Sequence, residues 1–481
     1  MKLPDHKTKI ICTIGPASDS PPVMEQMIRA GMDVARLNFS HGDFEKHRKV
    51  IENLRAAARA TGKRLAIMAD LPGPKMRIGQ LASEPVDLKP GDTFTLTTQE
   101  IVGDAARVSV TFSRLPMAVK PGDMLFLNDG LIQMEVVRIE SNDVRCRVLV
   151  GGELRSRKGL NLPGIDLGIS AFTDHDRRCL EFALEHGVDA ISQSFVESDT
   201  DILAVREAAA SLGHQPFIIA KIERSNALEH MESILETADG IMVARGDLGV
   251  EIPIEQITLV QKRLIRHANL LGKPVITATQ MLESMTNNRR PTRAEATDVA
   301  NAILDGTDCV MLSGESAMGE FPLEAVRMLA KIAAAVEPHR PGYRVRAALE
   351  AIGKDEKVNL ADLIALSVEA TLERVSPAAV FVPTRGGATA RSIARFRLPV
   401  WIVAVSSDES TCQRLQFSYG VCPTCEPDHP DDWNTYTKNW LNAHGVGGHL
   451  VVVTEGPSRK HPEANNRMEI IDLSGHVQGS P

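Results

Sequence analysis

Eight short apolar segments, separated by stretches long enough for a helix, constrain the fold of this 481-residue chain more than any other feature. Continuous apolar strands are typical of parallel sheets that are covered by helices on both faces. Eight strand–helix units predict a closed (β/α)8 TIM barrel, so the expected fold class is α/β. The predicted strands cover residues 9–14, 34–39, 65–69, 190–195, 217–222, 240–244, 274–279 and 309–312.

Two of the connecting helices carry clear boundary signals. Ser20 precedes Pro21, a residue type that favours the first helical position, and Gly31 ends this helical pattern. Thr173 is followed three residues later by Asp176, which is a capping-box pattern. These signals predict one helix from residue 20 to residue 31 and another from residue 173 to about residue 187.

The alternation of apolar strands and helices is interrupted between residues 70 and 173. Short alternating strands appear there at residues 93–97, 108–112, 134–139 and 144–150, and Lys-Pro-Gly-Asp turns begin at Lys89 and Lys120. This pattern predicts a small β-barrel lid domain inserted after the third barrel strand. Such an insertion leaves the barrel from its catalytic face.

A third region follows a charged connector that starts at Pro338. It contains a helix, predicted strands at residues 378–382, 400–405, 450–453 and 468–471, and a Gly-rich turn, which together predict a separate C-terminal α/β domain. The expected organisation is barrel (1–71), inserted lid (72–158), barrel (159–338) and C-terminal regulatory domain (339–481).

Composition excludes several classes of function. The net charge is −8, which argues against general nucleic-acid binding. No apolar run reaches membrane-spanning length and the first residues lack a secretion signal, so we expect a cytoplasmic protein without a membrane partner. The seven cysteines do not suggest a disulfide framework. Cys422 and Cys425 have redox or half-zinc spacing, but no second Cys/His pair lies nearby, so their role stays open.

Polar residues gather at the ends of the predicted strands. Strand alternation places Lys221 and Glu223 on one face, and Asp247 follows the next strand. Two acids at neighbouring strand ends can hold a hard divalent cation, and a lysine beside it would face an anionic substrate. Lys221 and Glu223 alone fit a surface ion pair equally well, but Asp247 and the other polar strand ends favour a catalytic site.

Several long strings resemble the pyruvate kinase family: residues 8–18, 34–42, 278–285, and 291–295 running on to 312–315. The resemblance extends from residue 7 almost to the end of the chain. It implies phosphoryl transfer from phosphoenolpyruvate to ADP, which gives pyruvate and ATP in the last step of glycolysis. It also implies a barrel, an inserted lid and a C-terminal domain.

The resemblance assigns roles to residues that match the family pattern. Glu223 and Asp247 match the carboxylates that hold Mg²⁺ or Mn²⁺. Lys221 matches the lysine that stabilises the transferred phosphoryl group and the enolate, Arg36 matches the arginine that clamps phosphate, and Arg77 resembles its supporting cation. Phosphoryl transfer depends on such positioned cations more than on covalent chemistry.

The same resemblance implies how the rest of the substrate is held and protonated. Backbone amides of residues 244–247, which are Ala244, Arg245, Gly246 and Asp247, would receive the substrate carboxylate at a helix N-terminus. Thr279 matches a threonine beside the methylene carbon that is protonated, through water, to give pyruvate. Ser313 and Glu315 would continue this proton relay.

The nucleotide is expected on the side of the barrel where the lid returns. The residues that match nucleotide contacts there are Pro16, Asn38, His41, Arg77 and Lys158. The alternative for His41 is a histidine at a helix N-terminus without any nucleotide contact.

One segment departs from the commonest family pattern. Many members have Thr in place of Leu71 and Glu in place of Lys75, and they need K⁺ held by equivalents of Asn38, Ser40, Asp70 and the carbonyl of Leu71. The ammonium group of Lys75 would compete with a bound cation, because two cations a few ångströms apart repel. We therefore expect no K⁺ requirement. The alternative is that Lys75 points to solvent and leaves the site unchanged.

The turn Thr384, Arg385, Gly386, Gly387, Ala388, Thr389 follows a strand and opens a helix. Such a turn offers amides and hydroxyls to a phosphate, and in pyruvate kinases it binds a sugar-phosphate effector. The family often has Ser at the position of Gly386, and the loop 456–464 is less Gly-rich than expected. A simple strand–helix turn is the alternative, and the effector's identity is open.

Two other functions are compatible with a barrel of this kind. A lyase acting on a 2-keto acid also uses paired acids or a Schiff-base lysine, but Glu223 beside Lys221 keeps that lysine charged. A non-catalytic phosphometabolite sensor would be expected to have lost the acids or the lysine, and Thr279 is retained with them. Pyruvate kinases are typically homotetramers, although the sequence shows no interface.

Overall fold

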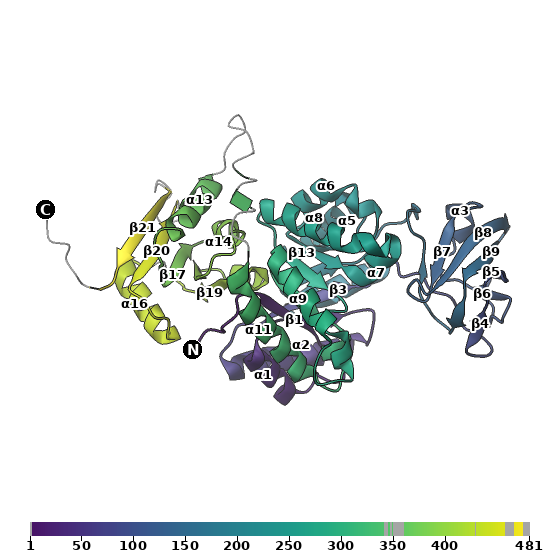
Figure 1. Cartoon of the computed structure of the whole chain (residues 1–481), viewed down its shortest axis with the longest axis horizontal. Helices are drawn as coiled ribbons and strands as arrows, with labels where there is room; N and C mark the ends of the chain where they lie inside the picture. The colour runs from purple at the N-terminus through teal and green to yellow at the C-terminus, as the bar shows by residue number, and fades with distance from the viewer. Residues whose placement is uncertain are drawn as a thin grey trace.

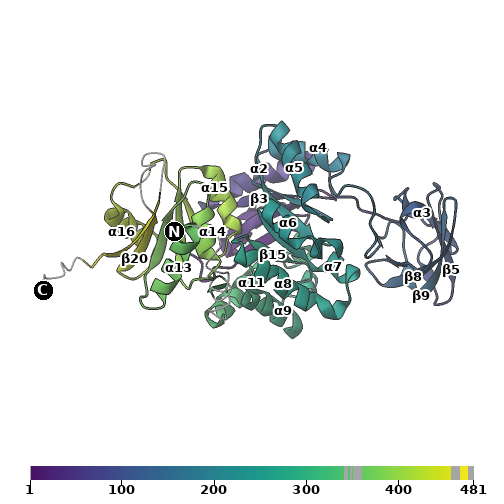
Figure 2. The same cartoon turned by 90° about the horizontal axis from the view of Figure 1, so that it is seen from above.

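The computed structural model describes residues 2–340, 345–346, 349, 360–428, 430–456 and 466–474. Figures 1 and 2 show three parts in a row, with the inserted lid and the C-terminal domain at opposite ends of a central barrel. The predicted fold class is confirmed: a closed barrel of eight parallel strands carries an inserted β module and a C-terminal α/β domain.

The barrel closes in the order β1-β16-β15-β14-β13-β12-β3-β2. Nearly every residue of these strands is buried, which accounts for their continuous apolar sequences. Four strands, β1, β2, β12 and β15, stop one or two residues short of their predicted ends; after β12 and β15 the chain turns away at Phe195 and Thr279, which adopt positive φ. The strands are β1 (Lys9–Thr13), β2 (Met32–Asn38), β3 (Ala66–Leu71), β12 (Ala190–Gln193), β13 (Phe217–Ile222), β14 (Gly240–Ala244), β15 (Val275–Ala278) and β16 (Cys309–Leu312).

Amphipathic helices surround the barrel and bury one face each against the strands. The predicted boundary at Gly31 is present, with φ of 125°, and Thr173 and Asp176 form the predicted capping box. The helices of this part are α1 (Pro21–Ala30), α2 (Phe44–Thr61), α4 (Asp174–Glu185), α5 (Asp199–Ser211), α6 (Met231–Thr237), α7 (Arg245–Glu251), α8 (Ile257–Leu270), α9 (Arg293–Asp305), α10 (Gly314–Ala317) and α11 (Pro322–Val336).

The inserted module consists of two sheets around their own apolar core. One sheet has the order β11-β7-β8-β9-β5-β6, and the other pairs β10 with β4. Asp92 and Asp123 accept hydrogen bonds from the backbone of Lys89 and Lys120, which closes the two predicted turns. The elements are β4 (Val86–Leu88), β5 (Thr93–Thr97), β6 (Arg107–Ser109), α3 (Leu115–Ala118), β7 (Met124–Leu127), β8 (Ile132–Glu140), β9 (Asp143–Val150), β10 (Gly152–Leu154) and β11 (Leu160–Asn161).

The C-terminal domain has a five-stranded sheet in the order β19-β18-β17-β20-β21. The sequence analysis did not predict β19, since Pro423 normally interrupts a strand; it is tolerated because β19 lies at the sheet edge. The elements are α13 (Leu360–Leu372), β17 (Ala379–Pro383), α14 (Ala388–Ala394), β18 (Trp401–Ser406), α15 (Glu409–Arg414), β19 (Val421–Cys425), α16 (Trp433–His444), β20 (Leu450–Glu455) and β21 (Arg467–Asp472).

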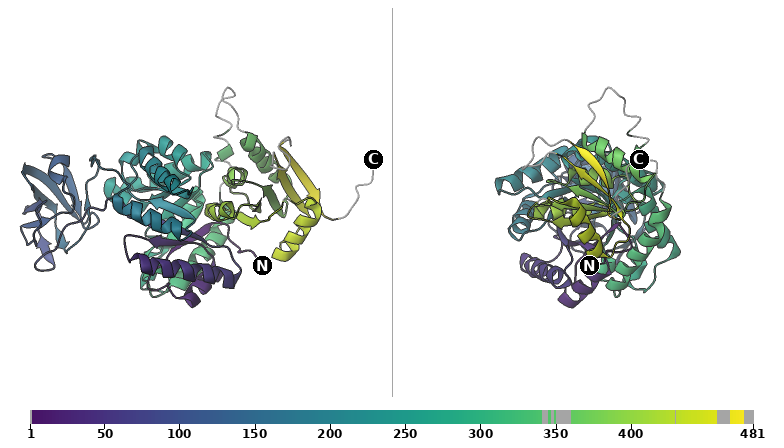
Figure 3. Two further views of the ribbon diagram at one scale, coloured as in Figure 1. Left: turned by 180° about the vertical axis from the view of Figure 1, so that it is seen from behind. Right: turned by 90° about the vertical axis from the view of Figure 1, so that its left-hand side faces the viewer.

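This domain closes the end of the barrel opposite the lid (Figure 3). Phe417, from the C-terminal domain, is fully buried in the apolar cluster at the strand starts and stacks on Phe217 at 5.5 Å between ring centroids. Asp308, just before β16, forms an ion pair with Arg397 at 2.7 Å. The base of the barrel is therefore sealed by fixed protein contacts, and the mouth faces the lid.

No helix among the described residues is both long enough and apolar enough to cross a membrane.

Candidate active site at the barrel mouth

Lys221, near the end of β13, lies at the centre of a buried polar cluster at the barrel mouth. Its Nζ lies 2.9 Å from Glu223 and 3.2 Å from Asp70, and it donates a 2.6 Å hydrogen bond to the hydroxyl of Ser194. Burial alone would lower the pKa of Lys221, but the charges of Asp70 and Glu223 outweigh burial and raise it. The side chain is thus a fixed ammonium group.

Asp70, at the end of β3, joins Lys221 to Arg36 of β2. Arg36 donates a 2.7 Å hydrogen bond from Nε to Asp70 and a 2.9 Å bond from Nη1 to the hydroxyl of Thr13. Burial opposes ionisation of Asp70, but Arg36 and Lys221 lower its pKa below the ordinary value. One ionised carboxylate therefore positions two cations side by side, which suits the binding of a phosphate group.

Glu223 and Asp247 are the two acids available for a metal ion. Burial raises the pKa of Glu223, Lys221 partly opposes this rise, and the negative charge of Asp247 adds to it. Asp247 is half-buried and has no hydrogen-bond or ion-pair partner among the described residues. An acid whose charge is disfavoured by burial and by a second, unpartnered acid beside it fits a divalent cation whose remaining ligands are water and substrate oxygens.

Glu223 is also oriented by the backbone. Its Oε2 accepts a 2.8 Å hydrogen bond from the amide of Phe195, which has a φ of 57°. This positive φ is a strained conformation for a bulky residue, and such strain is concentrated at functional sites.

Thr279 shows the same strain at the end of β15, with φ of 67°. Its hydroxyl donates to the carbonyl of Ala278 at 2.7 Å and accepts a bond from the amide of Gly246 at 2.8 Å. Thr279 is thereby held against the start of α7, the segment predicted to receive a carboxylate. Arg245 is turned away from this segment, because its guanidinium group binds the carbonyl of Thr279 at 2.7 Å and Asp298 at 2.7 Å.

Ser313 and Glu315 follow β16. Glu315 is fully buried, and its two oxygens accept hydrogen bonds from the amides of Leu282 at 3.0 Å and Ser313 at 2.7 Å. Both carboxylate oxygens are thus occupied by backbone groups, an arrangement suited to positioning the loops after β15 and β16. Ser313 is half-buried beside them.

Cations dominate the side predicted for the nucleotide. Partial burial lowers the pKa of His41, and the nearby charges of Lys75, Arg77 and Arg36 lower it further. Arg77 donates a 2.7 Å hydrogen bond to the carbonyl of Arg157 at the returning lid strand. Of the other predicted contacts, Pro16 is exposed, whereas Asn38 and Lys158 are half-buried.

The predicted monovalent-cation residues lie around the end of β2 and β3. Asn38 accepts a 3.1 Å hydrogen bond from the amide of Ser40, Asp70 is occupied by Arg36 and Lys221, and Leu71 is buried. Lys75 is exposed and has no ion-pair partner among the described residues. Its charge reaches His41, but no bond joins it to Asn38, Ser40 or Asp70 in the described part of the chain.

The predicted effector turn lies far from the mouth, between β17 and α14. Thr384 accepts a 2.9 Å hydrogen bond from the amide of Gly387, which has φ of 81°. A Cβ at Gly386 would meet open space, and Arg385, Gly386 and Ala388 are exposed, whereas Thr389 is half-buried. Of the loop 456–464, residues 457–464 lie outside the described residues.

Cys422 and Cys425 lie on β19 and are not in a disulfide. The described residues contain no group of three or more His, Cys, Asp or Glu side chains that could hold a metal ion.

Sequence reasoning missed the serines that complete the cluster. Ser194 accepts from Lys221, and Ser192 donates a 2.8 Å hydrogen bond to Asp70. Ser192 lies near the end of β12 and Ser194 directly follows this strand, and the sequence did show that this strand end is polar. The sequence did not show which residues these serines contact, because that depends on the register between β12 and its neighbours β3 and β13.

Fold and site together define a (β/α)8-barrel enzyme whose mouth binds an anionic substrate beside paired acids. The family model described as the barrel domain of pyruvate kinase matches residues 5–326, and its alpha/beta domain matches residues 362–471. The chain belongs to the pyruvate kinase family. It is accordingly a phosphotransferase, and the substrates implied by the family are phosphoenolpyruvate and ADP.

Individual relatives agree over nearly the whole length. A pyruvate kinase of Thermococcus litoralis is 50% identical over 98% of this chain and 100% of its own. One of Geobacillus stearothermophilus is 42% identical over 98% of this chain and 82% of its own. A crystal structure of a pyruvate kinase from Cryptosporidium parvum superposes with a TM-score of 0.90 at 37% identity, covering 98% of this chain and 96% of that one.

Proposed function

We propose that the cluster around Lys221 carries out the transfer of the phosphoryl group from phosphoenolpyruvate to ADP. The observation that supports this most strongly is the ionised Asp70, which holds Lys221 and Arg36 together at the mouth. A transferred phosphoryl group spreads negative charge over its oxygens, and fixed cations stabilise that charge without reorganising. Arg36 binds the phosphoryl group, and Lys221 stabilises it and the enolate oxygen left behind.

Glu223 and Asp247 would hold Mg²⁺ or Mn²⁺, as the family generally uses Mg²⁺, and the ion would neutralise charge on the phosphoryl oxygens. The amides of residues 244–247 orient the substrate carboxylate. Arg77, Lys158 and His41, with Pro16 and Asn38 beside them, bind the nucleotide on the cationic side of the mouth.

The enolate that remains after transfer must gain a proton at its methylene carbon to become pyruvate. Thr279 lies at the correct end of β15 and is fixed by Gly246. A hydroxyl is a weak acid, so Thr279 delivers the proton from water. Ser313 continues the relay, and Glu315 holds the amide of Ser313 in place.

The test is a coupled assay for ATP and pyruvate formation with the native chain, Glu223→Gln and Asp247→Asn. The native chain should form both products in equal amounts. Each variant should lose most of its turnover, and raising the Mg²⁺ concentration should recover part of the activity. Near-normal turnover in either variant at low Mg²⁺ would contradict the assigned metal site.

K⁺ independence is part of the same proposal. The support is electrostatic: the charge of Lys75 acts on His41 together with the charges of Arg36 and Arg77, and a bound K⁺ would be repelled by them. Activity should be equal in KCl and in tetramethylammonium chloride, and Lys75→Glu should create a K⁺ requirement. Strong stimulation of the native enzyme by KCl would refute this part and leave the assigned reaction intact.

Regulation by a sugar phosphate bound at residues 384–389 is also proposed. The exposure of Arg385, Gly386 and Ala388 and the open space at Gly386 support it. A sugar phosphate should raise the thermal midpoint of the native chain but not that of Thr384→Ala combined with Thr389→Ala. An unchanged midpoint across a panel of sugar phosphates would argue for a simple strand–helix turn.

We further propose a cytoplasmic homotetramer, as the resemblance to the family implies. The mass of the particle in solution, measured by light scattering, tests the assembly, and cell fractionation tests the location. A monomeric particle at assay concentration would contradict the tetramer.

A further inference from the structure

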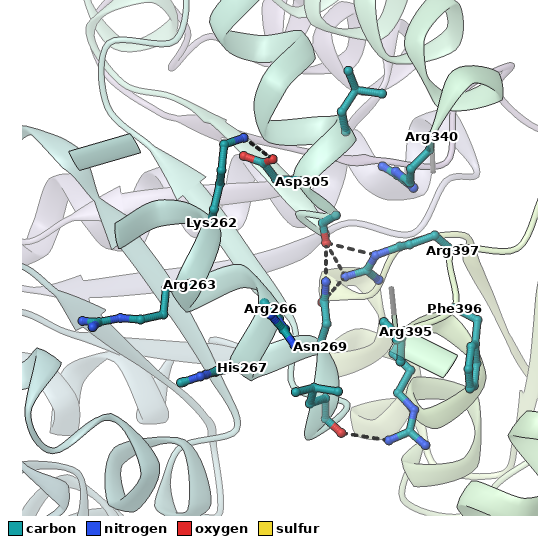
Figure 4. A pocket seen from close by; sticks show the side chains of 14 residues that line it. Lys262, Arg263, Arg266, His267, Asn269, Asp305, Arg340, Arg395, Phe396 and Arg397 are labelled. Atoms are coloured by element: carbon teal, nitrogen blue, oxygen red, sulfur yellow. Dashed lines mark hydrogen bonds and ion pairs between the residues drawn. The ribbon is translucent and has the colours of Figure 1, made fainter. Parts of the chain in front are cut away.

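A cavity of about 740 Å³ lies between the barrel and the C-terminal domain, away from the mouth. Figure 4 shows that its walls come from α8, from the end of α9 and from the segment after α14. Its described lining contains a single acid, Asp305, but many cations: Lys262, Arg263, Arg266, Arg340, Arg395 and Arg397.

Protein carboxylates compensate only half of these cations. Lys262 pairs with Asp305, Arg395 with Asp362 at 2.8 Å, and Arg397 with Asp308 at 2.7 Å. The other three, which are Arg263, Arg266 and Arg340, have no ion-pair partner among the described residues. The cavity therefore carries a surplus of positive charge in a chain whose net charge is −8.

Arg340 is the most unusual of these side chains. Its Nε donates to the carbonyl of Ile303 at 2.8 Å and its guanidinium group stacks over Tyr419 at 4.3 Å. The terminal nitrogens Nη1 and Nη2 are buried and make no well-aligned hydrogen bond among the described residues, although the Tyr419 hydroxyl and the charges of Glu337 and Asp308 lie nearby. Burial lowers the pKa of Arg340, as it does for Arg395. A buried cation without a direct ion pair is costly, and an anion bound in the cavity would lower this cost.

The volume of the cavity falls within the range of about 300–1,000 Å³ typical of small-molecule sites. Guanidinium groups bind phosphate oxygens through paired hydrogen bonds, which explains arginine here better than lysine would. We propose that this cavity binds a small phosphorylated anion and that its occupancy is felt at the barrel mouth. It lies at the C-terminal end of α14, whereas the turn 384–389 lies at the N-terminal end, about 10 Å away along the helix.

A chain of hydrogen bonds connects the cavity to the mouth. Asp305, the partner of Lys262, accepts a 3.2 Å bond from Gln261, and Gln261 accepts a 3.3 Å bond from Arg245. Arg245 in turn binds the carbonyl of Thr279 at 2.7 Å. An anion that draws Lys262 away from Asp305 changes the first link of this chain, and the last link positions the proposed proton-delivery residue.

The binding test uses the full chain, with the thermal midpoint measured at constant ionic strength and without Mg²⁺. The probes are inorganic phosphate, pyrophosphate, nucleotides and sugar phosphates, which distinguish simple phosphate binding from binding of a phosphorylated metabolite. At least one probe should raise the native midpoint. Arg263→Ala combined with Arg266→Ala should weaken its apparent affinity at least tenfold.

Two control variants separate this cavity from other anion sites. Arg327→Ala removes an exposed arginine from α11 that forms no ion pair with any described residue, and Thr384→Ala with Thr389→Ala removes the proposed effector turn. Both should keep the response to the probe. An equal response in the Arg263/Arg266 variant, or no response of the native chain to any probe, would overturn the site.

The coupling is tested with the probe that gives the largest rise. At saturation it should change the half-saturating concentration of phosphoenolpyruvate at least twofold in the native enzyme, and Gln261→Leu should abolish that change while keeping the thermal response. An unchanged half-saturating concentration in the native enzyme would overturn the coupling. The thermal response does not depend on turnover, so its failure is distinguishable from failure of the proposed catalytic roles.

Discussion

The two ends of the barrel both contain buried ionic groups, but these groups are satisfied in different ways. At the base, Asp308 accepts 2.7 Å bonds from two nitrogens of Arg397 and further bonds from the amides of Tyr419 and Val275. At the mouth, Lys221 contacts both Glu223 and Asp70, but Asp247 and Lys75 have no ion-pair partner among the described residues.

The difference shows how one fold separates stability from chemistry. At the base, the Asp308–Arg397 ion pair and the ring of Phe417 are satisfied by protein contacts alone, and the proposed anion site lies in the cavity beside them. The mouth leaves charges incompletely compensated and keeps Phe195 and Thr279 in strained conformations, which supports the proposal that a metal ion and substrate complete it. Substitutions at the mouth should therefore affect turnover most, and substitutions at the base should affect stability most.

The largest effect is expected at the mouth. Lys221→Met removes the central cation and should lower turnover by about 10³-fold, which is the size seen when one electrostatic stabiliser is lost. The matched control is Lys273→Met near the base, where Nζ donates a 2.7 Å hydrogen bond to the carbonyl of Ala238 and has no ion-pair partner in the described part of the chain. Steady-state assays should show a change below about threefold for the control. Equal losses in both variants would remove the distinction between the two ends.

A smaller effect, and one of another kind, is expected at the base. Phe417→Ala leaves a cavity among the strand starts and should lower the free energy of unfolding by about 3 kcal/mol. Urea denaturation measures this loss, and assays below the transition should show nearly native turnover. A large fall in turnover with little loss of stability would contradict the claim that the base serves stability rather than catalysis.

The pH dependence of stability sharpens the comparison further. The pKa of Glu223 is raised in the folded state above its ordinary value of 4.5, so between these two pKa values the folded chain binds more protons than the unfolded chain. Without Mg²⁺, ionisation of Glu223 therefore costs stability as pH rises above about 4.5. The free energy of unfolding of Glu223→Gln minus that of the native chain should therefore increase as the pH rises above about 4.5. A difference independent of pH would contradict the raised pKa.

The smallest effect concerns backbone strain at the mouth. Gln280 is exposed and has φ of 52°, a conformation that glycine adopts more easily. Gln280→Gly should raise the free energy of unfolding by about 0.5–1 kcal/mol. The control Gln256→Gly, at φ of −89°, should not stabilise the chain. Equal changes in both variants would show that strain at Gln280 is negligible.

Much of the fold could be predicted because the barrel strands are apolar without interruption, and alternation placed Lys221 and Glu223 on one face. Sequence could not reveal that Asp70 joins Arg36 to Lys221, since this depends on the order of strands around the barrel. The sequence also could not show that Phe417 packs against the base of the barrel, because its partner Phe217 is distant along the chain. The cationic cavity combines residues more than 100 positions apart, and a pattern along the chain does not show such a grouping.

The account depends most on the claim that the charges at the mouth await a ligand, whereas the Asp308–Arg397 pair and Phe417 at the base do not. Its direct test is the thermal midpoint with and without Mg²⁺ for the native chain, Glu223→Gln and Phe417→Ala. At free Mg²⁺ ten times its dissociation constant, the native chain should gain about 1.4 kcal/mol of stability. Phe417→Ala should show the same gain from a lower starting midpoint, and Glu223→Gln should show none. An equal gain in Glu223→Gln, or no gain in the native chain, would contradict the account.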